Sequence, residues 1–403
     1  METLKALTKS THVSTGARIT GALRVMSPMA WVALGSAIGL LIAGNWVGWV
    51  ELTTVGSTMV VLLCLAAFFT LGRTALDVTL ELKPDRVTAG ERAAASVMIR
   101  NSSERRMLPV RMEMSVGIGT AEFDVPSLAA SDNHEELFVI PTVRRGVIPV
   151  GPATSVRSDP LGLLRRTQTW TDVVPLIVHP VTINLAQLGT GFIRDLEGRA
   201  TNDMSDSDVA FHTLREYMPG DEQRHIHWLS TARTGSIMIR QFIETRRSHV
   251  GIALDGSKEA FRSDEEFETA VSVAASLGIR ILLDDQQVTM VAGGGRIPTT
   301  NRNVFLDSLS LIESGGNRSN VPAAISGLLR IADGLSLAVV ITGSTVGLDA
   351  IRRAAARFPG DVRVLVIRID ADTPTSFQPL GRQWLLSLAA LNDLPHLLWA
   401  AVA

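Results

Sequence analysis

The sequence lacks several features that mark common classes of protein. Its single cysteine, Cys64, excludes an intrachain disulfide and a cysteine-based zinc site. Its 38 basic and 40 acidic residues give a net charge of −2, so there is no overall positive field to hold nucleic acid. Charged residues make up only 19% of the 403 residues and hydrophobic residues 46%, which excludes a disordered chain and predicts a sizeable core in more than one domain.

The motifs of nucleotide-binding proteins are also missing. No G-x-x-x-x-G-K-[ST] sequence occurs, and no G-x-G-x-x-G sequence follows a predicted strand. The three glycines at residues 293–295 therefore predict a turn rather than a phosphate-binding loop.

Two long runs near the N-terminus, residues 29–50 and 52–71, contain no charged residue. Each has the length of a helix that crosses roughly 30 Å of hydrocarbon. Only Glu51 separates them, which predicts a tight transmembrane hairpin with Ser27 and Pro28 at its start. The second full-length run argues against a cleaved signal peptide, and the lack of ionisable residues within both runs predicts an anchor rather than a transporter.

Basic residues flank this hairpin on both sides, whereas its connecting turn carries only an acid. Lys5, Lys9, Arg18 and Arg24 precede the first run, and Arg73 follows the second. The positive-inside rule therefore places both termini and all later domains in the cytoplasm. We expect a multi-pass protein of the inner (cytoplasmic) membrane with two spans.

Four glycines of the first run, Gly35, Gly39, Gly44 and Gly48, form two small-xxx-small spacings. Such spacings let another helix approach closely. We expect them to pack the first span against the second, and dimerisation through the first span is the alternative.

From about residue 76 to residue 180 the sequence consists of short alternating apolar runs separated by turn residues. Short strands at fairly regular spacing, with no helix of useful length between them, predict an antiparallel β sandwich. No cluster of carboxylates, histidine or serine with catalytic spacing occurs here, so we expect recognition or scaffolding from this domain.

From about residue 181 onward, β-branched runs alternate with helical stretches. This alternation predicts a parallel sheet covered by helices on both faces, which is a doubly wound α/β domain. Ligands of such sheets bind beyond the carboxyl ends of the strands. The predicted strands are residues 249–255, 287–293, 335–343 and 362–370, and the predicted helices are residues 264–284, 320–333 and 346–358.

The stretch LREYMPGDEQRHIHWLSTARTGSIMIRQFIETR, at residues 214–246, resembles the signature of the bacterial domain of unknown function 58 family. Upstream, RRGVIPVGP, SDPLGLLRR and IVHP are similar to the segments that close the preceding β domain in that family. The resemblance implies a C-terminal domain similar to von Willebrand factor type A domains. It also implies association with MoxR-type AAA+ ATPases and neighbouring membrane proteins, and hence a membrane-tethered adaptor of a MoxR chaperone system.

The expected fold class is therefore multidomain, and the expected function is a cytoplasm-facing scaffold that binds a protein partner and not nucleic acid. The predicted parts are a cytoplasmic N-terminal segment (1–27), two transmembrane helices (28–72), a β-sandwich domain (73–180) and a type A-like α/β domain (181–403) with the signature at 214–246.

The resemblance to type A domains raises the question of a metal site after residues 249–255. Metal-binding type A domains hold Mg²⁺ with an Asp-x-Ser-x-Ser motif, a later Thr and an Asp after the fourth strand, all hard oxygen ligands. Here Asp255 and Ser257 match, Glu259 replaces the second Ser, and Gly343 stands at the position of the late Asp. One alternative is a degenerate Mg²⁺ site at Asp255, Ser257 and Glu259. The favoured alternative is that Asp255 caps the following turn and Ser257 caps the helix after it.

The signature stretch itself predicts a capped helix. Asp221 fits the N-cap of a helix that runs to about Arg233 and ends at Gly235. On such a helix His225 and His227 point about 200° apart, so they cannot share one zinc ion.

We expect this helix, preceded by a type II turn at Pro219 and Gly220, to be pinned by a charge-assisted hydrogen-bond network that is either structural or also a partner surface. The residues of this network or surface are Arg215, Glu216, Tyr217, Gly220, Asp221, Arg224, Trp228 and Arg233.

A hydrolase centred on His227 and Ser230 is the least favoured hypothesis. Ser230 lies one helical turn after His227 and Asp221 is near in sequence, but no nucleophile elbow is present. We therefore expect no catalytic residues in this chain.

Overall fold

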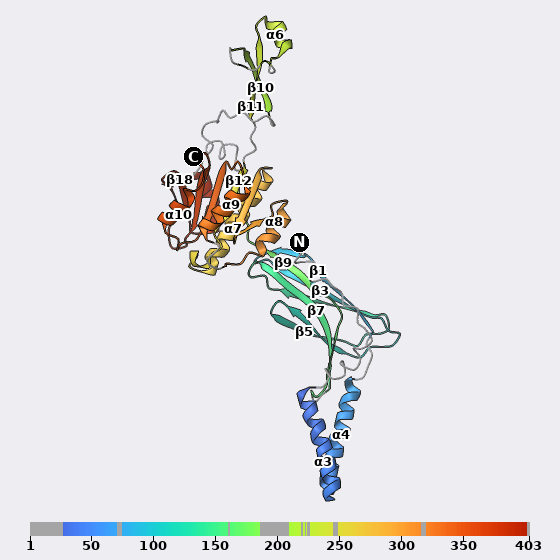
Figure 1. Ribbon diagram of the computed structural model, residues 1–403. Helices are drawn as coiled ribbons and strands as arrows, with labels where there is room; N and C mark the ends of the chain where they lie inside the picture. Colours follow the sequence, from blue (N-terminus) through green and yellow to red (C-terminus); the bar gives the residue numbers. More distant parts are fainter. Residues whose placement is uncertain are drawn as a thin grey trace. The chain divides into compact units, whose positions relative to one another are not determined.

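The computed structural model describes residues 27–70, 75–159, 162–185, 209–218, 221, 223, 226–244, 249–315 and 320–400 (Figure 1). The chain divides into two compact units, Met1–Val178 and His179–Ala403. The two apolar N-terminal helices and the several sheets of an α/β protein are present as predicted.

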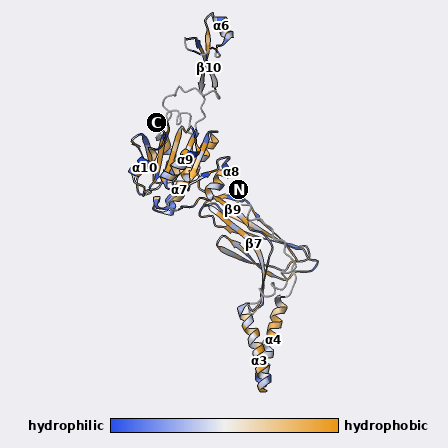
Figure 2. Ribbon diagram, in the orientation of Figure 1, coloured by the Kyte–Doolittle hydropathy of each residue, from blue (hydrophilic) through white to orange (hydrophobic). Residues whose placement is uncertain are grey.

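The N-terminal helices are α3 (Pro28–Val47) and α4 (Val50–Thr70). Both are long and apolar enough to cross a membrane, as Figure 2 shows by their hydropathy. Ser27 caps α3 through its hydroxyl oxygen, which accepts the backbone N–H of Ala30 at 3.2 Å, and Pro28 occupies the first turn. The predicted start of this helix is therefore confirmed.

Small residues let α3 and α4 approach closely. A Cβ placed at Gly44 would lie 2.7 Å from the Thr53 side chain, and one at Gly56 would lie 2.9 Å from Leu41. A Cβ at Gly35 or Gly39 would meet no atom within 4 Å. The predicted packing of span against span thus holds at Gly44, whereas Gly48 ends α3 with a φ of 76°.

The rest of the first unit is made of antiparallel strands in two sheets, with orders β1-β3-β6 and β2-β9-β7-β4-β5, and with β8 paired to β7. The two sheets share one apolar core, which takes Val97 and Ile99 from β3, Met112 and Met114 from β4, and Leu176 from β9. The alternating sequence of β3 produces an alternating burial pattern, since every second side chain faces this core. The strands are β1 (Leu76–Leu82), β2 (Arg86–Thr88), β3 (Ala93–Asn101), β4 (Val110–Val116), β5 (Gly119–Val125), β6 (Asn133–Ile140), β7 (Gly146–Ser158), β8 (Arg165–Thr169) and β9 (Val174–His179).

The second unit contains a seven-stranded sheet of order β14-β13-β12-β15-β16-β18-β17. Its five central strands are parallel, and the edge strands β14 and β17 are antiparallel to their neighbours. These strands are β12 (His249–Leu254), β13 (Gln287–Ala292), β14 (Gly295–Ile297), β15 (Leu337–Thr342), β16 (Arg363–Ile369), β17 (Ser376–Leu380) and β18 (Gln383–Leu388). The four predicted strands are present. Of the three glycines predicted to form a turn, Gly293 and Gly294 do so, and Gly295 begins β14.

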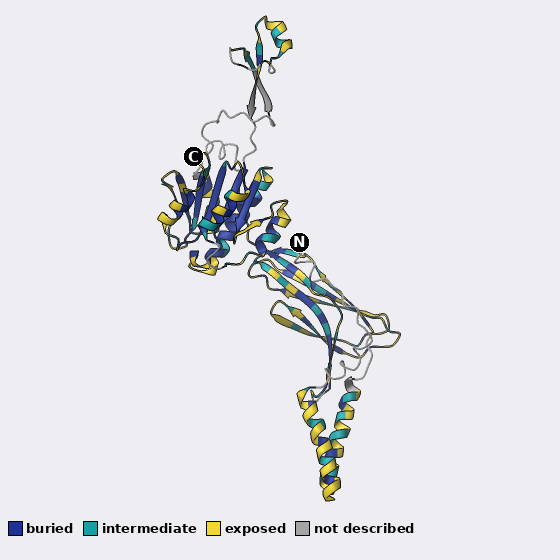
Figure 3. Cartoon of the chain, viewed as in Figure 1, coloured by how far each residue is buried: buried dark blue, intermediate teal, exposed yellow. Residues whose placement is uncertain are grey.

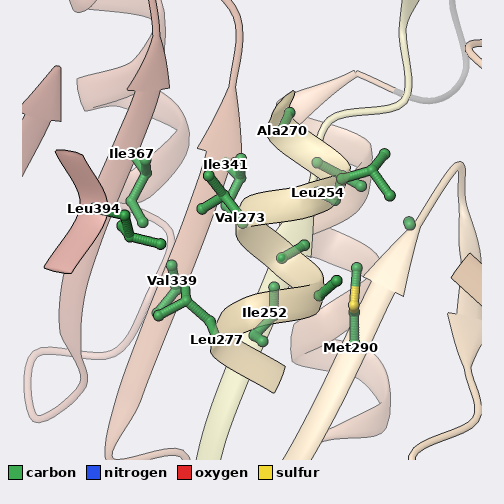
Figure 4. Packing of buried hydrophobic residues seen from close by; sticks show 14 of the residues in the cluster. Ile252, Leu254, Ala270, Val273, Leu277, Met290, Val339, Ile341, Ile367 and Leu394 are labelled. Carbon is green, nitrogen blue, oxygen red and sulfur yellow. The ribbon is translucent and has the colours of Figure 1, made fainter. Parts of the chain in front are cut away.

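Helices cover both faces of this sheet, which explains why every residue of β12 and β15 is buried. On one face, α7 packs Ala270, Val273 and Leu277 against strand residues that include Ile252 and Ile341 (Figure 4). Another apolar cluster joins α9 and α10 to the strands. The helices are α7 (Asp264–Leu283), α8 (Arg302–Ser310), α9 (Val321–Ile331), α10 (Leu348–Ala355) and α11 (Leu394–Ala400), with short 3-10 turns η2 (Lys258–Ala260) and η4 (Leu391–Asp393).

Candidate functional site

The signature residues lie at the end of a separate two-stranded hairpin. Strands β10 (Val209–Glu216) and β11 (Met238–Glu244) pair antiparallel, and α6 (Trp228–Thr234) lies between them in the chain. We call the described part of residues 215–238 the hairpin tip.

The helix of the hairpin tip begins later than predicted. Asp221 does not cap it, because Ile226 forms a β-bridge with Ile239 and the N–H of His227 donates to the carbonyl of Met238 at 2.8 Å. These bonds hold the chain extended up to His227, which is the N-cap residue. The predicted end of the helix is confirmed, because Gly235 is the C-cap residue of α6 and adopts a left-handed backbone conformation with a φ of 74°.

Asp221 braces the tip in a different way. Its two carboxylate oxygens each accept a guanidinium N–H of Arg215 at 2.7 Å, and one of them also accepts the backbone N–H of Met218 at 2.8 Å. The side-chain hydrogen bond from Arg215 is the main reason that the pKa of Asp221 lies below its ordinary value. A bidentate pair of this kind fixes orientation as well as distance, so it ties the loop to the end of β10.

The other predicted members of the network contribute less. The carbonyl of Glu216 accepts an Arg215 N–H at 3.1 Å, and the N–H of Tyr217 donates to Ile237 at 2.8 Å. Arg233 is exposed in the last turn of α6, where a positive charge suits the helix dipole. Gly220 and Arg224 lie outside the described residues, as do Pro219 and His225.

His227 and Ser230 do come together, but as a helix cap. The Nδ1 atom of His227 lies 2.8 Å from the Ser230 hydroxyl and 3.3 Å from the Ser230 backbone nitrogen, which donates to it. No carboxylate contacts His227 among the residues that the structure describes. The pair therefore satisfies an otherwise free N–H at the start of α6.

The braced tip exposes large apolar side chains. Trp228 and Leu229, in the first turn of α6, are 69% and 67% exposed (Figure 3). Met218, which follows β10, and Ile237, which precedes β11, are 66% and 45% exposed. Exposed apolar side chains on a rigid frame are typical of a binding surface.

The second candidate site lies at the carboxyl ends of β12 and β15, and it is closed. The buried Asp255 accepts the backbone N–H and the hydroxyl of Ser257 on Oδ1, at 2.9 and 2.6 Å, and the Thr342 hydroxyl on Oδ2 at 2.9 Å. Burial outweighs these bonds and raises the pKa of Asp255 above its ordinary value.

The remaining residues of the predicted metal site point elsewhere. Glu259 is exposed, and its backbone carbonyl accepts the Thr345 hydroxyl. Gly343 packs so tightly that a Cβ there would overlap the carbonyl oxygen of Ala260 and the ring of Phe261. A carboxylate at position 343 is therefore sterically excluded in this structure.

Protein donors already engage the Asp255 carboxylate. Of its roughly four lone-pair positions, three accept hydrogen bonds from Ser257 and Thr342. The described residues contain no group of three or more His, Cys, Asp or Glu side chains that could hold a metal ion. The arrangement fits the capping role of Asp255 better than direct coordination of Mg²⁺.

Comparison with known families places the hairpin tip and most of the seven-stranded sheet in one domain. A family described as "Protein of unknown function DUF58" matches residues 213–384. This part of the chain is a DUF58 domain.

No curated protein matches the chain. Among solved structures, the CARDB domain of the PF1109 protein from Pyrococcus furiosus is 15% identical over 26% of this chain and 91% of that one, with a TM-score of 0.20. A β-glucosidase from Listeria innocua is 15% identical over 27% of this chain and 17% of that one, with a TM-score of 0.20. The C-terminal domain of wzt is 13% identical over 28% of this chain and 78% of that one, with a TM-score of 0.21.

The structure shows two polar contacts in the DUF58 domain that the sequence analysis did not predict. Thr342 reaches Asp255, and a signal for this existed, because the carboxyl ends of parallel strands meet at the same sheet edge. Buried Glu266 accepts the Ser344 hydroxyl at 2.9 and 3.0 Å and the Arg262 N–H at 2.8 Å. Nothing in the sequence singles out this glutamate from the other acids of α7.

Proposed function

We propose that this protein is a membrane-anchored scaffold that binds a protein partner through the hairpin tip, and that the partner is a MoxR-type AAA+ ATPase. The observation that carries the proposal is the exposure of Trp228, Leu229 and Met218 on a tip braced by Arg215 and Asp221. Tryptophan and arginine are enriched among the residues that dominate binding energy in protein interfaces. The identity of the partner rests on the family resemblance of the signature stretch.

The architecture suits such a scaffold. In this proposal α3 and α4 anchor the chain in the cytoplasmic membrane, with both termini in the cytoplasm. The antiparallel strands form a β sandwich that serves as a spacer, and the seven-stranded sheet is a type A-like domain that presents the tip. The flanking basic residues support the orientation. No catalytic reaction is assigned to the chain.

Co-purification in mild detergent tests the proposal. The full-length chain is mixed with a purified MoxR-type ATPase of the same genome, and the complex is expected to be retained. The double substitution Trp228→Ala and Leu229→Ala is expected to abolish retention. Trp399→Ala is the matched control, because Trp399 is 75% exposed in α11 and its loss is expected to leave binding unchanged. Full retention by a folded double variant would remove the hairpin tip from the interface.

A further inference from the structure

The loop between β3 and β4, residues 102–109, presents basic and apolar side chains to solvent. Arg105 and Arg106 are exposed, and Leu108 is 72% exposed. Among the residues that the structure describes, no carboxylate pairs with either guanidinium, including that of Glu104 in the same loop. We call this segment the basic loop.

The basic loop is held firmly by the β domain. The amide of Asn101, itself 1% exposed, donates to the carbonyl of Arg105 at 2.9 Å and accepts the backbone N–H of Ser103 at 3.0 Å. The side chain of Met107 is buried in the apolar core, and its N–H donates to the carbonyl of Leu128 at 2.8 Å. The exposed side chains on either side of Met107 therefore stand on a fixed backbone, which lowers the entropy cost of binding through them.

The chain itself provides one link between the basic loop and the apolar helices. The N–H of Ser102 donates to the carbonyl of Ala75 at 3.1 Å. Ala75 follows Thr70, the last residue of α4, by five residues. Even a fully extended chain of that length spans only about 18 Å, so the base of the loop lies near this helix end.

The turn between β7 and β8 provides a second link. Leu164 is buried in a small apolar cluster with Ala30 of α3 and Ala66 of α4. The N–H of Ser27, which caps α3, donates to the carbonyl of Leu163 at 3.0 Å. This turn therefore contacts the helix pair at the end where α3 begins and α4 ends.

The register of β4 with β7 brings the basic loop next to this turn. Arg111 of β4 pairs with Val156 of β7. Two residues further toward the same end of the sheet, Pro109 of the basic loop is level with Ser158, the last residue of β7. Neighbouring strands lie about 4.8 Å apart. Both links thus place the basic loop at the end of the β domain that adjoins the helix pair.

We infer that the basic loop binds the surface of an anionic membrane, with Arg105 and Arg106 on lipid phosphates and Leu108 in the interface. The guanidinium fork matches phosphate oxygens, and a negative leaflet attracts basic residues beside a membrane span. An exposed leucine adds apolar area that the interface can bury. The inference rests on α3 and α4 spanning the membrane, as in the proposed function, but it does not depend on the protein partner. The loop would hold the β domain on the membrane surface.

Quenching of a fluorophore at position 108 tests this contact. The full-length chain with Cys64→Ser and Leu108→Cys is labelled with an apolar fluorophore and placed in lipid nanodiscs with a water-soluble quencher. When phosphatidylglycerol is added to phosphatidylcholine, the ratio of protected to exposed label is expected to rise about 30-fold, from about fivefold for each arginine. Adding Arg105→Gln and Arg106→Gln should return the ratio to its value in pure phosphatidylcholine.

Two matched controls use the far ends of the same strands. Arg92 is exposed just before β3, whose length of about 30 Å separates it from the basic loop, so Arg92→Gln should keep the full rise. Ile118 is fully exposed in the turn after β4. A label in Ile118→Cys should stay exposed to the quencher in both lipids.

Several results would overturn the inference. One is a label at position 108 that is equally exposed in both lipids, and another is a full rise in the double arginine variant. An equal rise on adding inorganic phosphate to phosphatidylcholine nanodiscs would identify a free anion as the ligand. A native chain that does not enter nanodiscs would refute the spans, and this inference with them. Native mass spectrometry of the unlabelled native chain, which needs no variant, should show retained phosphatidylglycerol in preference to phosphatidylcholine, and equal retention would contradict the lipid contact.

Discussion

Asp221 and Asp255 are two carboxylates of one DUF58 domain. Asp221 supports an exposed surface, whereas Asp255 lies in a closed, buried site. Both accept several hydrogen bonds, and both stand in stretches of sequence that suggested a functional site. Asp221 braces a tip that exposes Trp228 and Leu229, whereas Asp255 is buried beneath loops that close over it. The pKa of Asp221 is lowered and that of Asp255 is raised. A dense polar network thus braces both sites, and only the network around Asp221 carries the exposed side chains on which the proposed function rests.

The largest loss of stability is expected when a methyl group is added at position 343, beside the closed site around Asp255. Gly343→Ala places a Cβ on the carbonyl of Ala260, which belongs to the backbone and cannot rotate away. We expect a loss of about 3 kcal/mol and a decrease in Tm of roughly 6–12 °C, measured by thermal unfolding of the full-length chain in detergent. Gly347→Ala is the control, since a Cβ there meets no atom within 4 Å. Equal Tm values for the two variants would contradict the close approach of these loops.

Removal of the buried Asp255 carboxylate should reduce the free energy of unfolding by a somewhat smaller amount. Asp255→Ala leaves the donors of Ser257 and Thr342 without their shared acceptor, for an expected loss of about 2 kcal/mol. The hydroxyl groups can turn to other acceptors, which limits the cost. Asp349→Ala, at an exposed surface pair with Arg352, should change the Tm by much less. A native Tm for Asp255→Ala would show that the carboxylate does not hold these loops together.

The two carboxylates should respond to pH in opposite directions. The raised pKa of Asp255 means that the folded chain binds this proton more tightly than the unfolded chain, so its contribution to stability falls as pH rises from the ordinary value of 3.8 through the raised pKa. The lowered pKa of Asp221 gives stability that is present above 3.8 and lost as pH falls through the lowered value.

Tm profiles between pH 3 and pH 7 should resolve this difference as a small effect. Asp255→Asn should remove a contribution to stability that decreases as the pH rises. Asp221→Asn should remove a contribution to stability that increases as the pH rises. If both variants changed the pH dependence of Tm in the same direction relative to the native chain, the contrast between Asp221 and Asp255 would be refuted.

The smallest expected effect is that of divalent metal. Since the hydrogen bonds from Ser257 and Thr342 already engage the Asp255 carboxylate, calorimetric titration of the full-length chain with Mg²⁺ or Mn²⁺ should give no saturable heat and no change in Tm. Saturable heat that disappears in Asp255→Ala would establish the degenerate metal site and make the two carboxylates more alike than the structure indicates.

Sequence reasoning was most successful where one physical effect dominates. The spans followed from the length of uncharged sequence, and β12, β13, β15 and β16 from continuous β-branched runs. Strands β17 and β18 near the C-terminus and helix α8 were missed, because these short elements carry mixed patterns that no single period describes.

The error at α6 has a different cause. Asp221 has the sequence signal of an N-cap, but its carboxylate is engaged by Arg215, and pairing with β11 keeps the chain extended up to His227. Hairpin pairing of this kind is set by the partner strand and overrides local capping preference. The exposure of Trp228 and Leu229 could not be read from helical spacing for the same reason.

The most direct test of the account is the affinity of a purified MoxR-type ATPase for the detergent-solubilised chain. We expect saturable binding that Trp228→Ala with Leu229→Ala weakens by about 30-fold or more, while Asp349→Ala and Trp399→Ala leave the Kd unchanged. Binding of native strength by the folded double variant, or no binding by the native chain, would contradict the assignment of the hairpin tip as the partner surface.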